Sequence, residues 1–505
     1  MTRELLLGID LGTTVLKAAA FDAQSGKALA DKSIRLPVRT ARDGTREQDL
    51  AVVDRALAQV ASSLAKALGK AWRGVSGVGL AAQGGSAIIV DRCQGRALTP
   101  MQLWSDTRPL GLLAEIAARK TRGYWKQLSF LPEPGAGLAR MEWLRRKKRR
   151  LFQDGNLYCG AGEYVYFQLT GQWRQDAGNA LQIGCYDARR GGLTEGPLSL
   201  VGVPLSFVAP MRQGHETHTL SAAGARILGL PPGMPVAGPY MDHEAGYVAA
   251  SGESLRPLQC SLGTAWVGNY TLPRGSPPPS GYNLVLPSPV GPGHLIVRVM
   301  LAGNASWDWA TRELIWSPRQ SLARVEAIFR RQLLPPPGLV ALPWLTRPNL
   351  LDNVNAGSGA FLGIGTHTTR EDLVRAMAAC MCFEFTRAFE PVCRPKASRT
   401  VSAALLGGGA SQGEHFRSLL AELMAPLPVK VVQDQDMAGP RGTLYAFSRR
   451  VARCQARAVP RPARRLRAGI QRAYEHYLQT CRTMSRGLGD GGGILLEGCL
   501  QESKS

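Results

Sequence analysis

The chain has 505 residues, of which 45% are hydrophobic, and it carries a formal net charge of +23. This length suits two domains of about 250 residues each, and this apolar content excludes a disordered polymer. No uninterrupted run of about 18 apolar residues occurs, which excludes a membrane-spanning helix. Met1–Glu4 leads straight into the first expected strand, so we expect no signal peptide. The ten cysteines lack metal-type spacing, so we expect a cytoplasmic protein with its cysteines reduced in the core.

Positive charge is concentrated in two stretches, Arg140–Arg150 and Arg449–Arg467. Such clusters either neutralise nucleic-acid phosphates or cover solvated helix faces. Few aromatic residues interleave them, and no helix-turn-helix or zinc motif accompanies them. The sequence therefore favours solvated helix faces, and we predict no specific nucleic-acid partner.

The first elements expected along the chain are two strands within Leu5–Asp22, joined by the polar turn Asp10–Thr14. Gly12 permits close backbone approach to a ligand, and the hydroxyls of Thr13 and Thr14 suit phosphate oxygens. Asp10 would supply the hard oxygen ligand of a phosphate-bound Mg²⁺ ion. The alternative is a hairpin in which Asp10 only caps the turn.

The next segments alternate between strand and helix patterns. We expect a third strand at 33–38, a long amphipathic helix over 47–70 that ends near Gly69, and strands at 75–82 and 86–91. The turn Gln83-Gly84-Gly85 between these last two strands is a candidate ligand edge.

An aromatic ring, a carboxylate and a guanidinium follow within five residues, at Trp104, Asp106 and Arg108. These groups suit a polyhydroxylated substrate, which needs ring stacking together with paired donors and acceptors. A strand end with a structural Asp–Arg pair explains the same residues nearly as well.

Helical patterns dominate from 112 to 159, with a break at 132–135, and a further helix over 163–175 should stop at Gly171. Asp176–Asn179 then forms a polar cap for the next apolar segment. Within 236–251 a short strand leads to Asp242 at or beside a helix N-terminus, where a carboxylate stays ionised. The sequence leaves open whether Asp242 is a general base or an N-cap.

The second half of the chain begins with a repeat of the first motif. In Leu258–Tyr270 the turn Ser261-Leu262-Gly263-Thr264 stands where Asp10–Thr13 stood, which suggests two related domains facing one nucleotide. Further expectations are a long surface loop at 271–293, a strand at 296–304 with Gly303 at its junction to a helix, a helix over 372–391, a strand at 400–406 before Gly407–Ala410, and helices over 414–424 and 471–481.

With these motifs in order, the chain resembles the FGGY family of carbohydrate kinases. The resemblance runs from about residue 5 to 455 and rests on Gly8–Thr14, Gln83, Trp104-x-Asp106-x-Arg108, Leu169-Thr170-Gly171, Asp176-x-x-Asn179, Asp242, Gly263-Thr264 and Gly407–Ala410. It implies an α/β fold of two actin-like (ribonuclease H-like) domains, each with a mixed sheet flanked by helices and with the active site in the cleft between them. We expect a sugar-binding domain at 1–252, a nucleotide-binding domain at 253–485 and a tail at 486–505.

The resemblance also implies an ATP- and Mg²⁺-dependent phosphotransferase acting on a sugar, ketose or polyol, and a homodimer is left open. It assigns Asp242 as catalytic base and Asp10 as the catalytic, metal-side aspartate. The residues expected to bind ATP and its phosphates are Gly12, Thr13, Thr14, Lys17, Gly263, Thr264, Gly303, Gly408, Gly409, Ala410 and Gly413. Those expected to bind the substrate are Gln83, Gly84, Trp104, Asp106, Arg108, Asp242 and His243.

Departures from the family pattern bear on the substrate. Glycerol kinases follow the glutamine with Arg-Glu, and xylulokinases follow it with Met-His, whereas this chain has Gly84-Gly85. Glycerol is therefore not expected to be the preferred acceptor. Two alternatives to a sugar kinase are an actin-like ATPase that couples hydrolysis to conformational change, and a sugar-binding regulator that has lost catalysis.

Overall fold

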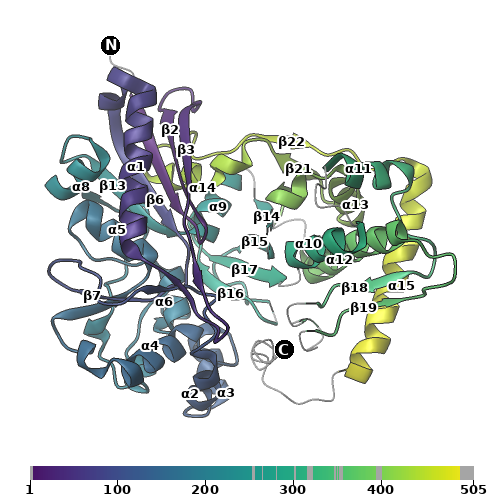
Figure 1. Ribbon diagram of the computed structural model, residues 1–505, viewed down its shortest axis with the longest axis horizontal. Helices are drawn as coiled ribbons and strands as arrows, with labels where there is room; N and C mark the ends of the chain where they lie inside the picture. Colours follow the sequence, from purple (N-terminus) through teal and green to yellow (C-terminus); the bar gives the residue numbers. More distant parts are fainter. Residues whose placement is uncertain are drawn as a thin grey trace.

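The computed structural model shows two α/β lobes side by side, with the N-terminal half of the chain in one and most of the C-terminal half in the other (Figure 1). It describes residues 4–488 except 253–255, 264, 280, 301–302, 316–321, 346–348, 350, 352–356 and 394–400.

The first lobe is built on a six-stranded sheet in the order β12-β13-β6-β1-β2-β3. Strands β1 and β2 form the expected antiparallel hairpin, and β1 lies parallel to β6 on its other side. The strands are β1 (Leu5–Leu11), β2 (Val15–Asp22), β3 (Ala28–Arg35), β6 (Val75–Ala82), β12 (Thr217–Thr219) and β13 (Pro235–Met241). The carboxyl ends of β1, β6 and β13 therefore meet at one edge, which collects the side chains of the site.

Alternation along β1 divides its side chains between the two faces of this sheet. Leu5, Leu7 and Ile9 pack into the core formed with α1 (Leu50–Leu68), α5 (Ala161–Thr170) and α8 (Ala222–Leu228). Leu6 belongs to a separate cluster with Leu444 and Val451, near the C-terminal end of the chain.

The second lobe repeats this topology. Its seven-stranded sheet has the order β16-β17-β15-β14-β20-β21-β22, in which β14 and β15 form an antiparallel hairpin and β14 lies parallel to β20. The strands are β14 (Pro257–Leu262), β15 (Trp266–Leu272), β16 (Leu284–Pro287), β17 (His294–Met300), β20 (Ala403–Gly407), β21 (Val429–Val432) and β22 (Ala456–Ala458). The prediction of two related α/β domains is thus confirmed at the level of strand order.

Helices cover the second sheet, with the long α15 along the far side of the lobe (Figure 1). Buried side chains of α12, α13 and α15 share the largest hydrophobic cluster with β14 and β15. The helices are α10 (Asn304–Ile315), α11 (Leu322–Arg331), α12 (Arg370–Cys393), α13 (Glu414–Leu423) and α15 (Arg464–Leu488), and a small hairpin of β18 (Val340–Leu342) and β19 (Ala360–Leu362) accompanies them.

A helical insertion in the first lobe completes the cleft. It contains α2 (Leu113–Ala117), α3 (Arg122–Ser129), α4 (Ala136–Lys147), α6 (Ala177–Ile183) and α7 (Gly196–Ser199). Short strands connect these parts, namely β4 (Arg39–Thr40), β5 (Arg46–Gln48), β7 (Ile88–Asp91), β8 (Met101–Gln102), β9 (Asn156–Cys159), β10 (Tyr186–Asp187) and β11 (Gly192–Leu193). Its hydrophobic cluster also contains Val267, Leu295 and Val297 of the second sheet, so the two lobes share an apolar contact.

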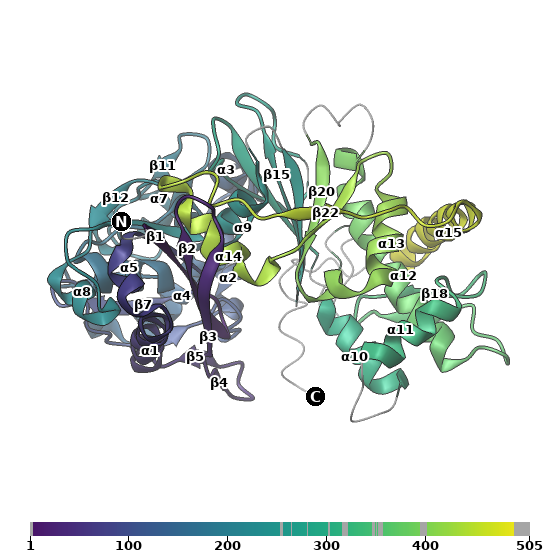
Figure 2. The same ribbon diagram turned by 90° about the horizontal axis from the view of Figure 1, so that it is seen from above.

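The chain returns to the first lobe near its C-terminal end. Helix α14 (Ala438–Gly442) lies beside α9 (Asp242–Ala250), between the two lobes (Figure 2). Glycines allow this close approach: a Cβ on Gly8 of β1 would collide with the carbonyl of Pro440, and one on Gly442 with the carbonyl of Ala245. The division of domains at residue 252 stays a prediction, and residues 438–442 pack on the first sheet.

Three predicted elements differ from the structure. The third strand is β3 over Ala28–Arg35 rather than 33–38, because it pairs with β2 through the tight turn after Asp22. Strand β9 occupies the end of the stretch predicted as helical, where it pairs with β7. The predicted loop at 271–293 contains strand β16, which pairs with β17 at the edge of the second sheet. In each case long-range strand pairing overrides a local pattern.

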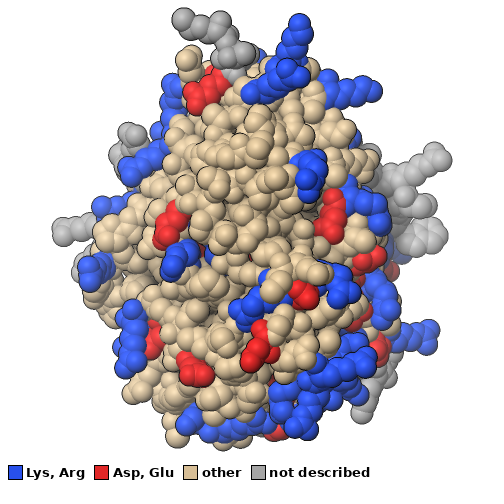
Figure 3. Space-filling view, turned by 90° about the vertical axis from the view of Figure 1, so that its left-hand side faces the viewer, with Lys and Arg blue, Asp and Glu red and all other residues tan. Residues whose placement is uncertain are grey.

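The basic cluster near Arg140–Arg150 is partly neutralised within the protein. Arg145 and Arg146 form ion pairs with the buried Glu142 at 2.9 and 2.8 Å, and Arg146 also pairs with Glu115. Acidic side chains lie among the basic ones over the visible face of the molecule (Figure 3). The absence of a specific nucleic-acid partner stays a prediction.

Among the helices of the described ranges, none has the length and apolarity needed to cross a membrane.

His415 of α13 provides a pH-dependent stability prediction. Its ring is 5% exposed and stacks on Phe329 at 3.9 Å, and burial lowers its pKa from 6.5 to about 3. Below pH 6.5 the imidazole therefore becomes protonated in the unfolded chain but stays neutral in the folded chain. The free energy of unfolding decreases as the pH falls from 6.5 towards 3. At pH 5 the loss amounts to about 2 kcal/mol relative to pH 8.

We expect His415→Leu to remove this pH-dependent component of the free energy of unfolding. Urea denaturation at pH 5 and pH 8 checks the result. The difference in free energy of unfolding between variant and wild type should change by about 2 kcal/mol between these pH values. His476→Leu, which replaces an exposed histidine, is the control. An unchanged difference at the two pH values would contradict the prediction.

Candidate functional site

The turn after β1 is tied to the end of β6. The Thr13 hydroxyl donates to Gln83 Oε1 at 2.8 Å, and Trp104 Nε1 donates to Thr13 Oγ1 at 3.1 Å. The backbone N–H of Gln83 donates to the Leu11 carbonyl at 2.8 Å, which fixes the two strand ends side by side. The predicted phosphate residue Thr13 thus contacts two predicted substrate residues, and Thr14 beside it is exposed.

Asp10 lies at the end of β1 beside helix α14. Burial, together with the nearby charge of Asp242, raises its pKa from 3.8 to about 7, although Lys17 acts in the opposite direction. Its Oδ1 atom is buried and accepts no hydrogen bond from any described residue. A Cβ on Gly439 would collide with Asp10 Oδ2, so the backbone of α14 forms one wall of this carboxylate site. Lys17 itself pairs with Asp436 at 3.0 Å.

Asp242 is the first residue of α9, directly after β13. The N-cap position belongs to Met241, whose N–H donates to Glu244 Oε2 at 3.2 Å. The Asp242 carboxylate accepts the His243 N–H at 2.9 Å, and both side chains are half-buried and line the same cavity. Asp242 is therefore not the capping residue of its helix, and it is among the residues that line the cavity.

Further buried carboxyl groups lie behind Asp242. Asp176 caps α6 by accepting the Asn179 N–H at 2.8 Å, as the sequence predicted, and Asn179 Nδ2 donates to Glu163 Oε1 at 2.7 Å. Burial raises the pKa of Asp176 to about 6 and that of Glu163 to about 8, and it raises the pKa of Glu244 well above 4.5. Sequence reasoning missed Glu163 and Glu244, because acidic residues inside helices carry no signal of burial.

Asp106 and Arg108 are mainly bonded to one another. The buried Asp106 carboxylate accepts from Arg108 Nε at 3.0 Å and from the Arg46 N–H at 3.1 Å. The Arg108 guanidinium also pairs with Glu47 and lies 4.7 Å from the centre of the Trp143 ring. This pair holds the loop that presents Trp104, whose side chain is 45% exposed. Of the three predicted residues, Trp104 is the one with free surface.

Gly84 and Gly85 leave room for a side chain from elsewhere. A Cβ on Gly84 would collide with Gln182 Nε2, and one on Gly85 would collide with Gln182 Oε1. The amide of Gln182, at the end of α6, therefore occupies the space beside Gln83, and its Nε2 lies 3.4 Å from Met241 Sδ. Sequence reasoning missed Gln182, since it lies about a hundred residues from these glycines.

The second glycine-rich region forms on the other lobe, where three chain segments meet. The Asn304 N–H, at the start of α10, donates to the Gly263 carbonyl at 3.2 Å. Gly408 has a φ of +87°, and its Cα packs against Leu262 so closely that a Cβ would collide. Predicted nucleotide residues Gly263, Gly303 and Gly408–Ala410 are thus brought together, and Gly413 precedes α13. Thr264 lies outside the described residues.

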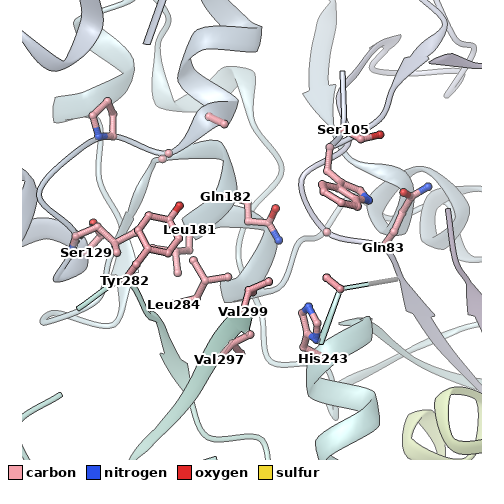
Figure 4. Close-up of a pocket in the computed structure, with 18 of the residues that line it drawn as sticks. Gln83, Ser105, Ser129, Leu181, Gln182, His243, Tyr282, Leu284, Val297 and Val299 are labelled. Carbon is pink, nitrogen blue, oxygen red and sulfur yellow. Dashed lines mark hydrogen bonds between the residues drawn. The ribbon is translucent and has the colours of Figure 1, made fainter. Parts of the chain in front are cut away.

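A cavity of about 460 Å³ connects these parts. Its lining includes Thr13, Gln83, Trp104, Asp242 and His243 from the first lobe and Ser261 and Gly263 from the second. Figure 4 shows Gln83, Ser105 and His243 on one side of this cavity and a group of apolar side chains on the other, with Gln182 between them. The arrangement places a carboxylate, amides and an exposed indole around a single cavity.

Comparisons with known proteins agree with this fold. Residues 5–249 match the model of the N-terminal domain of the FGGY family of carbohydrate kinases. The first lobe is therefore similar in sequence to the N-terminal domain of FGGY carbohydrate kinases. The chain is 23% identical over 416 residues to the xylulose kinase of Staphylococcus epidermidis, covering 81% of each chain, and 24% identical over 466 residues to the L-fuculokinase of Salmonella typhi, covering 88% and 93%.

Solved structures show the same fold. The xylulose kinase from Rhodospirillum rubrum superposes with a TM-score of 0.83 at 20% identity, covering 96% of this chain and all of that one. Plasmodium falciparum glycerol kinase with ADP gives a TM-score of 0.78 at 14% identity, covering 95% and 98%. The predicted fold of two actin-like domains is confirmed.

Proposed function

We propose that this chain is a carbohydrate kinase of the FGGY family, and that it transfers the γ-phosphate of ATP to a hydroxyl of a sugar, ketose or polyol with Asp242 as the general base. The observation that carries the proposal is the position of Asp242: its carboxylate lines the cavity that also contains Gln83 and Trp104, and its charge acts on Asp10. Phosphoryl transfer needs in-line positioning and charge neutralisation more than covalent chemistry.

Four side chains around the cavity have a role in this proposal. Asp242 accepts the proton of the attacking hydroxyl. Gln83 and His243 orient the acceptor, and the exposed face of Trp104 stacks on its carbon skeleton. The buried Gln83 Nε2 has no hydrogen-bond partner among the described residues, so it is the donor that a substrate oxygen would satisfy. Gly263 and Gly408–Ala410 present backbone to the nucleotide.

Asp10 fits a hydrated Mg²⁺ ion. Its buried Oδ1 has no partner among the described residues, and its pKa is raised by burial first and by repulsion from Asp242 second, both of which a cation would offset. Within the part of the chain that the structure describes, no three acidic, histidine or cysteine side chains are grouped to hold a metal. Mg²⁺ in phosphate sites needs only one or two carboxylates besides water and phosphate oxygens. When bound, the ion would neutralise charge on the transferring phosphate.

The experiment that tests this function is ADP release by the purified protein with and without a panel of pentoses, hexoses, ketoses and polyols. Sugar-dependent release that scales with one acceptor supports the proposal. Release that is independent of any acceptor would favour the actin-like ATPase alternative, and acceptor binding without release would favour a regulator that has lost catalysis.

Glycerol should rank low in that panel. In the resemblance to glycerol kinases, a paired arginine and glutamate follow the glutamine, whereas the neutral amide of Gln182 fills this space here. A site without these charged hydrogen-bond partners does not favour a small polar substrate such as glycerol over other acceptors. We expect kcat/KM for glycerol to lie at least about tenfold below that of the best ketose or aldose. Steady-state kinetics with both substrates checks this, and a higher value for glycerol would refute it.

A further inference from the structure

The cavity is larger and more apolar than the proposed chemistry requires. A cavity of about 150 Å³ holds one benzene-sized ring, whereas this one measures about 460 Å³. It therefore accommodates a sugar and a second group of similar size. The labelled apolar side chains of the lining lie on the side away from Gln83 and His243 (Figure 4).

We call this part the apolar chamber and define it by Leu181, Tyr282, Leu284, Val297 and Val299. Leu181 comes from α6 of the first lobe, while Leu284 comes from the edge strand β16 of the second and the two valines from its neighbour β17. The chamber is thus formed where the helical insertion of the first lobe meets the second sheet. Figure 4 shows these side chains grouped together, with Ser129 at their outer side.

Polar groups in and beside the chamber leave little for a second sugar ring. The Ser129 hydroxyl already donates to the Trp125 carbonyl at 3.3 Å, and the Gln182 amide stands at the border towards Gln83. The lining also carries the Tyr282 hydroxyl and Glu133, in the loop after Ser129, where burial raises the pKa of the Glu133 carboxyl and its Oε1 has no partner in the described residues. Sugar hydroxyls would lose water here without gaining enough partners, whereas an alkyl or aryl group loses nothing.

We infer that the acceptor is an amphipathic carbohydrate, in which an apolar alkyl or aryl group fills the chamber while the polyol part lies against Gln83, Trp104 and Asp242. This inference rests on the proposed function and names the class of its substrate. The chamber is continuous with the site of Asp242, so a single molecule spans both. Gln182, which lies between the two parts, would contact the atoms that link them.

The test compares methyl, ethyl, propyl, butyl and phenyl glycosides of xylose, glucose and fucose with the free sugars, again by ADP release. We expect kcat/KM to rise about three- to fourfold for each methylene that enters the chamber, since each buried methylene contributes in this range. Values that do not change with chain length, or that fall from methyl to butyl, would overturn the inference.

Variants of Leu284 locate the effect. This side chain is half-buried, so a carboxylate there reaches the chamber without entering the core. Leu284→Asp should abolish the increase with chain length, and Leu284→Phe, which shortens the chamber, should reverse the order of butyl and methyl. The matched control is Val290→Asp, a half-buried valine in the β16–β17 connection that does not line the cavity. An increase that survives both Leu284 variants would overturn the inference.

A binding measurement separates this inference from the proposed function. Phenol, observed by NMR of the ligand, should bind wild type and Val290→Asp but not Leu284→Asp, whether or not any sugar is phosphorylated. If no acceptor supports ADP release but phenol binds in this pattern, the proposed function fails and the apolar chamber stands. If sugars are phosphorylated without any effect of chain length and phenol does not bind, the chamber assignment fails alone.

Discussion

Asp242→Asn should lower acceptor-dependent ADP release by about 10²-fold or more, because a positioned general base contributes about 10²- to 10⁴-fold. Asparagine keeps the size and much of the polarity of the side chain but cannot accept the hydroxyl proton. Met241 holds the N-cap position, so helix α9 keeps its cap in the variant. The measurement is kcat with a saturating acceptor, alongside thermal melting and nucleotide titration.

The same data decide between the two roles that the sequence leaves open for Asp242. If Asp242 is the base, the Asp242→Asn protein stays folded and binds ATP but turns over its acceptor slowly. Asp10→Asn is the companion variant, for which we expect weaker Mg²⁺ dependence of nucleotide binding in addition to slower turnover. A folded Asp242→Asn protein that phosphorylates its acceptor near the wild-type rate would eliminate the general-base assignment.

Gly439→Ala should lower kcat at least about tenfold without adding or removing any charge, since small misplacements of a catalytic group are costly. A Cβ at this position collides with Asp10 Oδ2, and the flexible carboxylate is the part that moves. Alanine is also a better helix former than glycine, so the helical backbone of α14 tolerates it. The loss should be accompanied by an increase in the Mg²⁺ concentration needed for half-maximal activity.

Gly155→Ala is the control, because a Cβ there meets nothing within 4 Å. It should leave both kcat and the Mg²⁺ requirement unchanged. Thermal melting distinguishes displacement of Asp10 from general loss of structure. If Gly439→Ala has wild-type kinetics, then Asp10 either tolerates displacement or does not contribute to catalysis.

Local patterns in the sequence predicted a large part of the fold and the order of the candidate site residues along the chain. The hairpin over Leu5–Asp22, the helix stop at Gly171 and the strand-to-helix junction at Asp242 depend on neighbouring residues, and the structure has each of them. The repeat near Leu258–Tyr270 predicted a second, related sheet for the same reason: hairpin periodicity and turn residues are short-range signals.

Features that depend on distant segments could not be predicted. Gln182 fills the space beside Gly84, and α14 packs against β1, yet nothing in either local sequence points to its partner. The apolar chamber was hidden because its β16 side was predicted as a loop rich in proline and glycine. Burial of Glu163 likewise follows from packing alone, since the same helix position would be exposed in another fold.

The return of α14 to the first lobe has a consequence for synthesis on the ribosome. The glycine-lined surface of β1 forms within the first tens of residues, but the helix that covers it lies near residue 440. At elongation rates of about 5–20 residues per second, the roughly 200 residues between α9 and α14 take about 10–40 s to be translated. During that interval Leu6, Ala19 and Phe21 of the first lobe lack their packing partners Leu444 and Val451. Its folding is completed only when most of the second lobe has left the ribosome.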